Sequence, residues 1–305
     1  MTSNSIPNDL VVFERGWLSS NSLLMRGPEP TLVDTGHFSH ALQLEALLAH
    51  HLQEHHLHKI INTHLHSDHC GGNAHLQSVH AKVQVLIPPG QWNEVHDWSR
   101  MEEIHSEIGQ VCPAFSAHEQ IQPGQELIIH GRTWDVHAAP GHDKDAIMLF
   151  APQERILISG DAFWETGFGV VFPELYKAGG FDEVRNTLKL IETLDPLWVV
   201  PGHGNVFTHV ERCLQQAHQK LDYFESNPIS HAKYACKVFI KFKLMMMERM
   251  SRQSLYAWAL GCETLVSTKE HFFKDMDFQP WIDLLLQDLQ RNNSISCDEL
   301  MVLNH

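Results

Sequence analysis

The sequence predicts an α/β domain followed by a smaller helical C-terminal segment. Over about the first two hundred residues, short apolar runs alternate with amphipathic stretches, which is typical of strands with interleaved helices. After about Thr208 the strand-like runs cease, and the remaining stretches show helical spacing of their apolar residues. We therefore expect a first domain over residues 1–209 and a helical domain over residues 210–305 that caps a site or forms a homodimer interface.

The expected elements follow from these patterns in order along the chain. The apolar runs predict strands at residues 11–17, 22–25, 31–33, 59–62, 83–87, 133–138, 146–150, 156–159 and 198–200. Apolar residues at helical spacing predict helices between them at residues 41–57, 91–109 and 181–194. The same spacing predicts C-terminal helices at residues 210–225, 232–250, 252–260 and 279–290.

The composition narrows the classes of function. With 22 Lys and Arg against 37 Asp and Glu, the 305-residue chain carries a formal net charge of -15, which repels a phosphate backbone and disfavours nucleic-acid partners. The 24 histidines are many for a chain of this length and indicate metal binding. The N-terminus lacks the basic start and apolar run of a signal peptide, and no stretch is long enough to span a bilayer. We expect a cytoplasmic protein without a membrane association.

The six cysteines are scattered and include no CxxC pair, which disfavours a disulfide framework and a cysteine-based structural zinc site. They are interpreted as reduced thiols. Cys70, beside His69, is a candidate thiolate ligand or nucleophile, but a small buried apolar role at a helix start is the favoured interpretation.

Four potential metal ligands lie within six residues, directly after the predicted strand at residues 59–62. They are His64, His66, Asp68 and His69, and Gly71 and Gly72 follow them. In an extended segment, side chains two residues apart point to the same side, and a turn through Ser67 aims the next two toward a neighbouring point. Such a block can serve two ions a few ångströms apart, and the glycines allow close packing of backbone.

Three more candidate ligands follow later strands, each in a turn that contains glycine. They are His142 and His203, which each follow Pro-Gly, and Asp161, which follows Ser-Gly. Loops at the ends of strands are where a rigid scaffold displays functional groups, so one sheet edge can bring all seven side chains together.

With these motifs the sequence resembles the metallo-β-lactamase-fold hydrolase superfamily. The resemblance covers residues 10–208 and lies in Val33-Asp34-Thr35-Gly36, the His64-x-His66-x-Asp68-His69 block, His142, Asp161 and His203, all in family order. It implies an αββα sandwich with a dinuclear metal site at one edge of the two sheets. Carried over by position, His64, His66 and His142 would hold one ion, Asp68, His69 and His203 the other, and Asp161 would bridge them.

The bridging carboxylate looks more like glyoxalase II, the acyl-homoserine lactonases and the tRNA-processing phosphodiesterases than the true β-lactamases, which lack it. His66 stands where the flavodiiron oxygen reductases have glutamate, and this disfavours redox iron chemistry. Imidazole and carboxylate ligands without thiolate suit zinc, and also iron or manganese. We expect two divalent ions per chain, most readily zinc.

Two such ions supply hydroxide from a bridging water near neutral pH, polarise the scissile carbonyl or phosphoryl oxygen and stabilise the oxyanion. No Ser or Cys nucleophile is then required. Asp68 is also a candidate catalytic residue that accepts a hydrogen bond from the nucleophilic water and shuttles a proton to the leaving group. Asp34 is interpreted as a carboxylate that orients the His64 to His69 loop without touching metal.

The segment after Asp161 is aromatic and glycine-rich, and it predicts either the wall of a substrate pocket or an ordinary packed connection. The candidate wall residues are Phe163, Trp164, Phe168 and Tyr176. Aromatic walls with few charges fit an acyl substrate. The leading hypothesis is therefore hydrolysis of a small-molecule carboxylic ester, thioester or lactone by metal-activated hydroxide. The alternatives are a phosphodiesterase or nuclease of the same fold, and a regulatory ligand-binding protein that retains the metal site.

Overall fold

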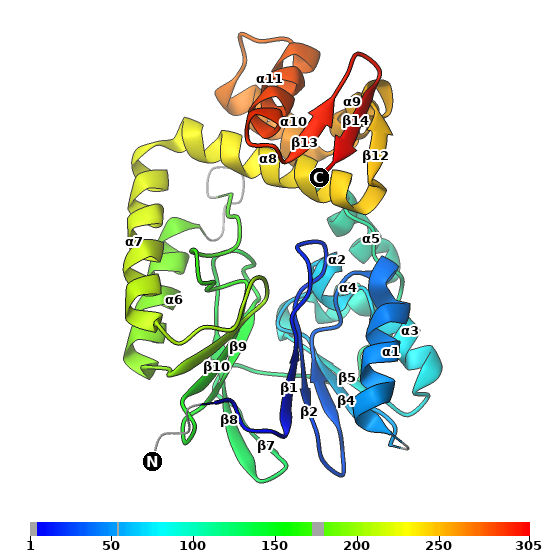
Figure 1. Ribbon diagram of the computed structural model, residues 1–305, viewed down its shortest axis with the longest axis vertical. Helices are drawn as coiled ribbons and strands as arrows, with labels where there is room; N and C mark the ends of the chain where they lie inside the picture. The colour runs from blue at the N-terminus through cyan, green and yellow to red at the C-terminus, as the bar shows by residue number, and fades with distance from the viewer. Residues whose placement is uncertain (1–4, 54, 173–179) are drawn as a thin grey trace.

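The computed structural model describes residues 5–53, 55–172 and 180–305. Two sheets lie face to face with helices on both outer sides, and a C-terminal segment lies across one end of the sheets (Figure 1). The six strands of the first sheet have the order β1-β2-β3-β4-β5-β6: Leu10–Phe13, Ser22–Met25, Thr31–Val33, Lys59–Ile61, Gln84–Ile87 and Glu119–Gln120. The five strands of the second have the order β11-β10-β9-β8-β7: Trp198–Pro201, Ile156–Gly160, Ile147–Ala151, Arg132–Ala138 and Glu126–Ile129.

Helices cover the outer face of each sheet. The first sheet carries α1 (Ala41–Leu52), α3 (Asn73–Val79), α4 (Trp92–His96) and α5 (Trp98–Glu107), and the short α2 (Ser67–Cys70) follows β4. The second sheet carries α6 (Phe181–Leu194) and α7 (Val210–Ser226). The layer order is helix, sheet, sheet, helix, which confirms the predicted αββα sandwich (Figure 1).

Strand residues alternate between the two faces of each sheet, and both faces are buried. In β2, Leu23 faces the second sheet whereas Leu24 packs against the helices of the first. In β10, Ile158 lies between the sheets and Leu157 packs under α6 and α7. Side chains along a strand have a period of two, so near-continuous apolar runs are what a sheet buried on both faces requires.

The C-terminal segment has a hydrophobic core of its own. It consists of α8 (Pro228–Met247), α9 (Arg252–Gly261), α10 (Glu263–Phe272) and α11 (Phe278–Arg291), with Trp281 and Leu285 fully buried among them. A small antiparallel sheet of β12 (Arg249–Ser251), β14 (Met301–Asn304) and β13 (Ile295–Cys297) completes it. The predicted helical segment is present, and the sheet is an addition that the sequence did not predict.

Several predicted boundaries were wrong for identifiable physical reasons. The first strand ends at Phe13 instead of residue 17, since the chain turns there into the loop that carries Trp17. Helix α1 ends at Leu52 because Gln53 adopts a φ of 54°. Helix α8 ends at Met247, where Glu248 has a φ of 59°, and Met250 belongs to a strand. A left-handed residue of this kind stops a helix.

The sheets place the carboxyl ends of several strands at one edge of the sandwich. β3 and β4 are parallel, as are β10 and β11, so each pair ends at the same edge. The residues that follow these four strands are Asp34, the loop at residues 62–72, Asp161 and Gly202-His203. Within the described ranges, no helix is long and apolar enough to cross a membrane.

Candidate functional site

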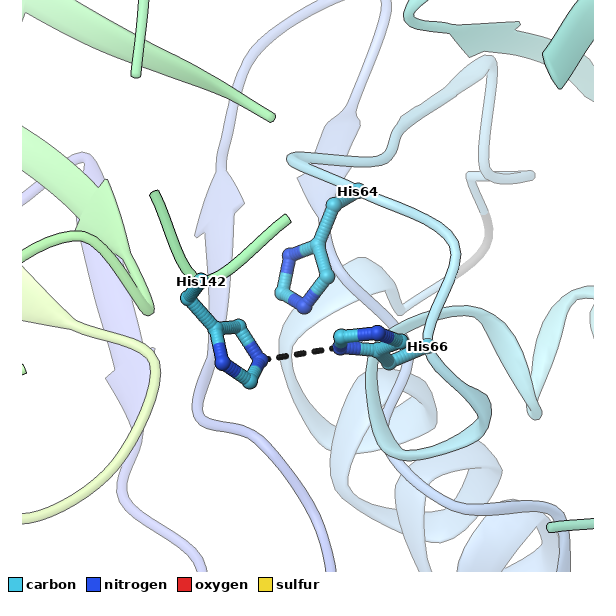
Figure 2. A group of neighbouring side chains, drawn as sticks. All are labelled: His64, His66 and His142. Atoms are coloured by element: carbon cyan, nitrogen blue, oxygen red, sulfur yellow. Dashed lines mark hydrogen bonds between the residues drawn. The ribbon is translucent and has the colours of Figure 1, made fainter. Parts of the chain in front are cut away.

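Three histidine rings converge from two different loops. His64 and His66 follow β4, and His142 follows β8. Figure 2 shows the three rings facing one another, with a hydrogen bond of 2.9 Å between His142 Nε2 and His66 Nδ1. The centroid of the His64 ring lies 4.7 Å from that of His66 and 5.4 Å from that of His142.

The Asp161 carboxylate lies between this group and a second one. Its Oδ2 is 3.4 Å from His142 Nε2, whereas its Oδ1 is 3.2 Å from His69 Nε2 and 3.8 Å from His203 Nε2. His203 Nε2 also lies 3.1 Å from Asp68 Oδ2. The structure thus brings all seven predicted side chains together, with the two oxygens of Asp161 directed to different groups.

Asp34 holds the loop that carries the first four of these residues. Its Oδ1 accepts a hydrogen bond from the backbone N–H of Thr63 at 2.8 Å, and its Oδ2 lies 2.8 Å from both Thr63 Oγ1 and His69 Nδ1. Because a carboxylate oxygen accepts, the proton of His69 lies on Nδ1 and the lone pair of a neutral ring lies on Nε2, toward Asp161. This is the orienting position that the sequence predicted for Asp34.

Glycines make the close approach of these turns possible. A Cβ on Gly202 would overlap Asp161 Oδ1, and one on Gly71 would overlap the backbone oxygen of Ser67. The His203 turn is fixed from the other side by the buried Asn21, whose amide donates to the backbone oxygens of Pro201 and Gly204 at 3.0 and 2.8 Å. Small residues and a buried amide therefore set the spacing of the loops.

Burial and charge pairing set the protonation of the site. Burial lowers the pKa of His66 to about 3 and that of His64 well below its ordinary value, which keeps both rings neutral. Burial also opposes a charge on His69, but the Asp161 and Asp34 carboxylates outweigh it and raise its pKa. The Asp161 carboxyl has a lowered pKa because His69 and His203 outweigh the effect of its burial. Neutral imidazoles and ionised carboxylates are the forms that bind metal, so His64, His66 and Asp161 already have the required form, whereas His69 would release a proton when it binds an ion.

The side chains fit a pair of metal ions. Among the seven converging side chains, potential ligand atoms within 4.8 Å of one another form three groups: His64, His66 and His142; Asp68, His69 and His203; and His64, His69 and Asp161. His64 Nε2 is buried without a hydrogen-bond partner in the described part of the chain, although such an atom normally has one. A metal ion at the centre of these groups would satisfy it.

A cavity of about 620 Å³ opens beside this centre. Five of the seven side chains line it, namely His66, Asp68, His142, Asp161 and His203. Of the predicted wall residues, Trp164 lines the cavity and donates its Nε1–H to Asp161 Oδ1 at 3.2 Å. Phe163 and Phe168 are buried in the core between β10, α6 and α7 and do not line it, so their prediction was wrong. Tyr176 lies outside the described residues.

Sequence reasoning missed other parts of the wall. Trp17 stacks on His203 with ring centroids 5.5 Å apart, and α8 contributes a row of apolar and basic residues to the cavity. Lys220 of α7 also lines it, with its ammonium 5.2 to 5.7 Å from the ring centroids of Phe168, Phe224 and Tyr234. The signal for Lys220 was a charged residue on the otherwise apolar face of α7, beside Leu221.

The comparisons with known proteins agree with this geometry. The family model of the metallo-beta-lactamase superfamily matches residues 15–203, which is more than half of the chain. The chain belongs to the metallo-β-lactamase superfamily. Its matched region contains every one of the seven converging side chains, and superfamily membership confirms the predicted resemblance.

Curated relatives and solved structures extend the comparison. This chain is 27% identical over 255 residues to a beta-lactamase-like protein 2 homolog of Caenorhabditis elegans, and the match covers 81% of this chain and 75% of that protein. It is 27% identical over 190 residues to the acyl-coenzyme A thioesterase MBLAC2 of Gallus gallus, covering 58% of this chain but less than two thirds, 64%, of the relative.

A solved metallo-beta-lactamase family protein from Thermus thermophilus shares the fold with a TM-score of 0.56 at 16% identity, over 99% of this chain and 100% of that one. The family and its named thioesterase relative confirm the predicted enzyme class, a hydrolase.

Proposed function

We propose that the protein hydrolyses thioesters of small acyl groups with the help of two divalent metal ions. The observation that carries the proposal is the Asp161 carboxylate, which directs one oxygen to His142 and the other to His69 and His203 beside a cavity. A carboxylate in that position suits a bridge between two ions. The thioesterase named among the relatives supports this choice of bond over a carboxylic ester or a lactone.

The ligand sets follow the groups of neighbouring atoms. One ion would be held by His64, His66 and His142, and the other by Asp68, His69 and His203, with Asp161 shared between them. Zinc is the favoured metal because nitrogen and oxygen donors without thiolate suit it, and iron and manganese suit the same donors. When bound, such ions act as Lewis acids that stabilise negative charge on the reacting carbonyl oxygen and make water a better nucleophile.

The protein's own residues position the reactants and move the proton. Hydrolysis adds water across the acyl carbon–sulfur bond, which yields a carboxylic acid and a thiol. Burial acts to raise the pKa of Asp68, but the hydrogen bond from His203 and the charge of His69 outweigh burial and lower it to about 2, so the carboxylate is ionised at neutral pH. We assign to Asp68 the acceptance of a hydrogen bond from the attacking water and the relay of a proton to the departing sulfur.

The cavity walls suit an acyl chain. Trp17 and Trp164 cover one side of His203 with ring centroids 5.5 and 5.4 Å away, and Val238, Phe242 and Met245 of α8 face the same cavity. These apolar side chains favour burial of hydrocarbon, and Lys220, Lys237 and Lys241 add positive charge to the same cavity. We propose that residues 210–305 cap the site, since α8 supplies these side chains. A homodimer through the C-terminal helices stays a prediction.

A substrate panel tests the proposal. Zinc-reconstituted wild-type protein is assayed with butyryl-coenzyme A, an alkyl butyrate ester, γ-butyrolactone and a phosphodiester. The number of zinc ions bound per chain is measured as well. We expect release of free thiol from the thioester, at least two equivalents of zinc, and a fall in kcat/KM of at least about 100-fold in Asp161→Asn. The exposed Asp275→Asn provides the matched control.

Two outcomes decide against thioester hydrolysis. Turnover of the phosphodiester with none of the thioester would reassign the substrate. An Asp161→Asn variant that keeps full thioesterase activity would show that the cavity at this site is not where the bond is cleaved.

A further inference from the structure

A second cluster of potential metal ligands includes a residue of the ligand loop, residues 62–72. Cys70, His105 and Cys112 offer ligand atoms that all lie within 4.8 Å of one another. Cys70 is fully buried, and His105 and Cys112 are 2% and 6% exposed. The three residues come from α2, the last turn of α5 and the segment that follows α5.

The sulfur atoms are spaced as two ligands of one tetrahedral ion would be. Cys70 Sγ and Cys112 Sγ are 3.7 Å apart, and neither forms a disulfide. A zinc–sulfur bond of about 2.3 Å with tetrahedral angles gives a sulfur–sulfur distance of about 3.8 Å. The observed separation therefore needs almost no adjustment to receive an ion.

His105 is oriented in the way that a metal ligand is. Its Nε2 lies 2.9 Å from the backbone oxygen of Leu65, so this nitrogen carries the proton and donates it. Its Nδ1 is buried and has no hydrogen-bond partner among the described residues. Metal-bound histidines donate their other ring N–H to a backbone carbonyl or carboxylate in this manner. As thiols, the two cysteines could donate to each other and to the backbone oxygens of Leu65 and Pro113, which lie 3.5 Å from Cys70 Sγ and 3.7 Å from Cys112 Sγ. Those hydrogen bonds would explain the sulfur spacing but would leave His105 Nδ1 unsatisfied.

We propose that Cys70, His105 and Cys112 bind a third metal ion, a zinc ion in a Cys₂His site that is distinct from the histidine and carboxylate centre. Thiolate and imidazole are donors that zinc prefers, and with three protein ligands the fourth tetrahedral position would be taken by water. Binding releases the two thiol protons to solvent, so the pair of thiolates neutralises the charge of the ion.

The third ion would stabilise the loop that carries the first ligands. Cys70 directly follows His69, and the Leu65 carbonyl that accepts from His105 lies between His64 and His66. An ion at the cluster would therefore tie both ends of this loop to α5. The site needs no catalytic activity, and its existence does not depend on the proposed reaction.

Cobalt titration tests the site because thiolate ligands give Co²⁺ an intense near-ultraviolet charge-transfer band that imidazole and carboxylate ligands do not give. Metal-free, reduced wild-type protein should bind three equivalents of Co²⁺, with the band following one of them. Cys112→Ser should lose the band and one equivalent, whereas His142→Ala should keep the band and lose affinity at the other centre. Cys297→Ser, half-buried in β13, is the matched control.

Cadmium-113 NMR of the wild-type protein gives a second measurement that does not depend on whether any variant folds. A resonance in the range of mixed sulfur and nitrogen ligation reports the site directly. A wild-type protein with neither the charge-transfer band nor this resonance refutes the proposal. A band that persists undiminished in Cys112→Ser refutes it as well. Thioesterase activity is not part of either measurement, so the two proposals succeed or fail separately.

Discussion

Replacing Asp34 by asparagine tests how the ligand loop is held. Asp34 accepts from three donors at 2.8 Å each, the Thr63 N–H, the Thr63 hydroxyl and His69 Nδ1. An asparagine has one oxygen and one NH₂ group in place of the two carboxylate oxygens. With its oxygen toward the Thr63 N–H, the NH₂ group faces the hydroxyl, which can turn to accept, and His69 Nδ1–H, which cannot.

The mismatch has two possible resolutions, and each has a known size. If His69 keeps its tautomer, a buried donor is left unpaired at a cost of about 1–3 kcal/mol to the free energy of unfolding. If the proton moves to Nε2, the atom that lies 3.2 Å from Asp161 Oδ1 loses its lone pair. Both outcomes weaken metal binding by Asp68, His69 and His203, and we expect an affinity loss of about 10- to 100-fold at that site.

Competition between the protein and a fluorescent zinc chelator measures the effect. Asp34→Asn should lose the tight binding of the one zinc equivalent that Asp68, His69 and His203 hold. The equivalent at His64, His66 and His142 should stay tightly bound. Asp275→Asn, an exposed substitution of the same type, should match the wild type. As many tight zinc equivalents as in the wild type, all with wild-type affinity, in Asp34→Asn would show that the carboxylate does not control the tautomer of His69.

Three further predictions concern the cavity and the turns. Burial lowers the pKa of Lys220 to about 8, below its value of about 10.4 in the unfolded chain. Between these two pH values the unfolded chain binds more protons than the folded one, so the free energy of unfolding rises with pH. In urea unfolding at about pH 7 and about pH 10, the free energy of unfolding of the wild type should rise by about 2 kcal/mol more than that of Lys220→Met. An equal rise in both proteins would contradict the prediction. Gly202→Ala places a Cβ on Asp161 Oδ1 and should lower thioesterase kcat/KM about 100-fold, whereas Gly261→Ala, with open space, should not. Trp164→Phe keeps an aromatic side chain but removes the N–H that donates to Asp161. Titration calorimetry should show that this variant binds zinc about 10-fold more weakly than the wild type.

The sandwich was predictable because its strands are buried on both faces. Leu23 and Leu24 on β2, or Leu157 and Ile158 on β10, belong to different hydrophobic layers, and a run of apolar residues records both layers at once. The C-terminal sheet has no comparable apolar run in the sequence, because β12 and β14 are only three and four residues long and lie about fifty residues apart in the chain. Their pairing depends on the packing of the helices between them.

For the site, too, one part was predictable from the sequence and another was not. The seven converging side chains were predictable because metal binding requires particular residue types, and because they lie in glycine-containing turns that follow predicted strands. The walls were not, because hydrocarbon can be supplied by any apolar residue at any distance along the chain. Phe163 and Phe168 satisfied the local pattern but point into the core, whereas Phe242 of α8 reaches the cavity from a helix that begins about sixty residues later.

Contacts at the end of α5 connect the C-terminal segment to the loop at residues 62–72. The Glu107 carbonyl accepts from Thr264 Oγ1 at 3.1 Å, and the Gly109 carbonyl accepts from Trp258 Nε1 at 3.3 Å. His105, two residues before Glu107, donates to the carbonyl of Leu65 inside the loop. A displacement of the C-terminal helices would therefore act on the loop through α5 as well as through the cavity wall. Because packed elements shift as units, substitutions at Trp258 should alter zinc affinity although that ring touches none of the seven side chains.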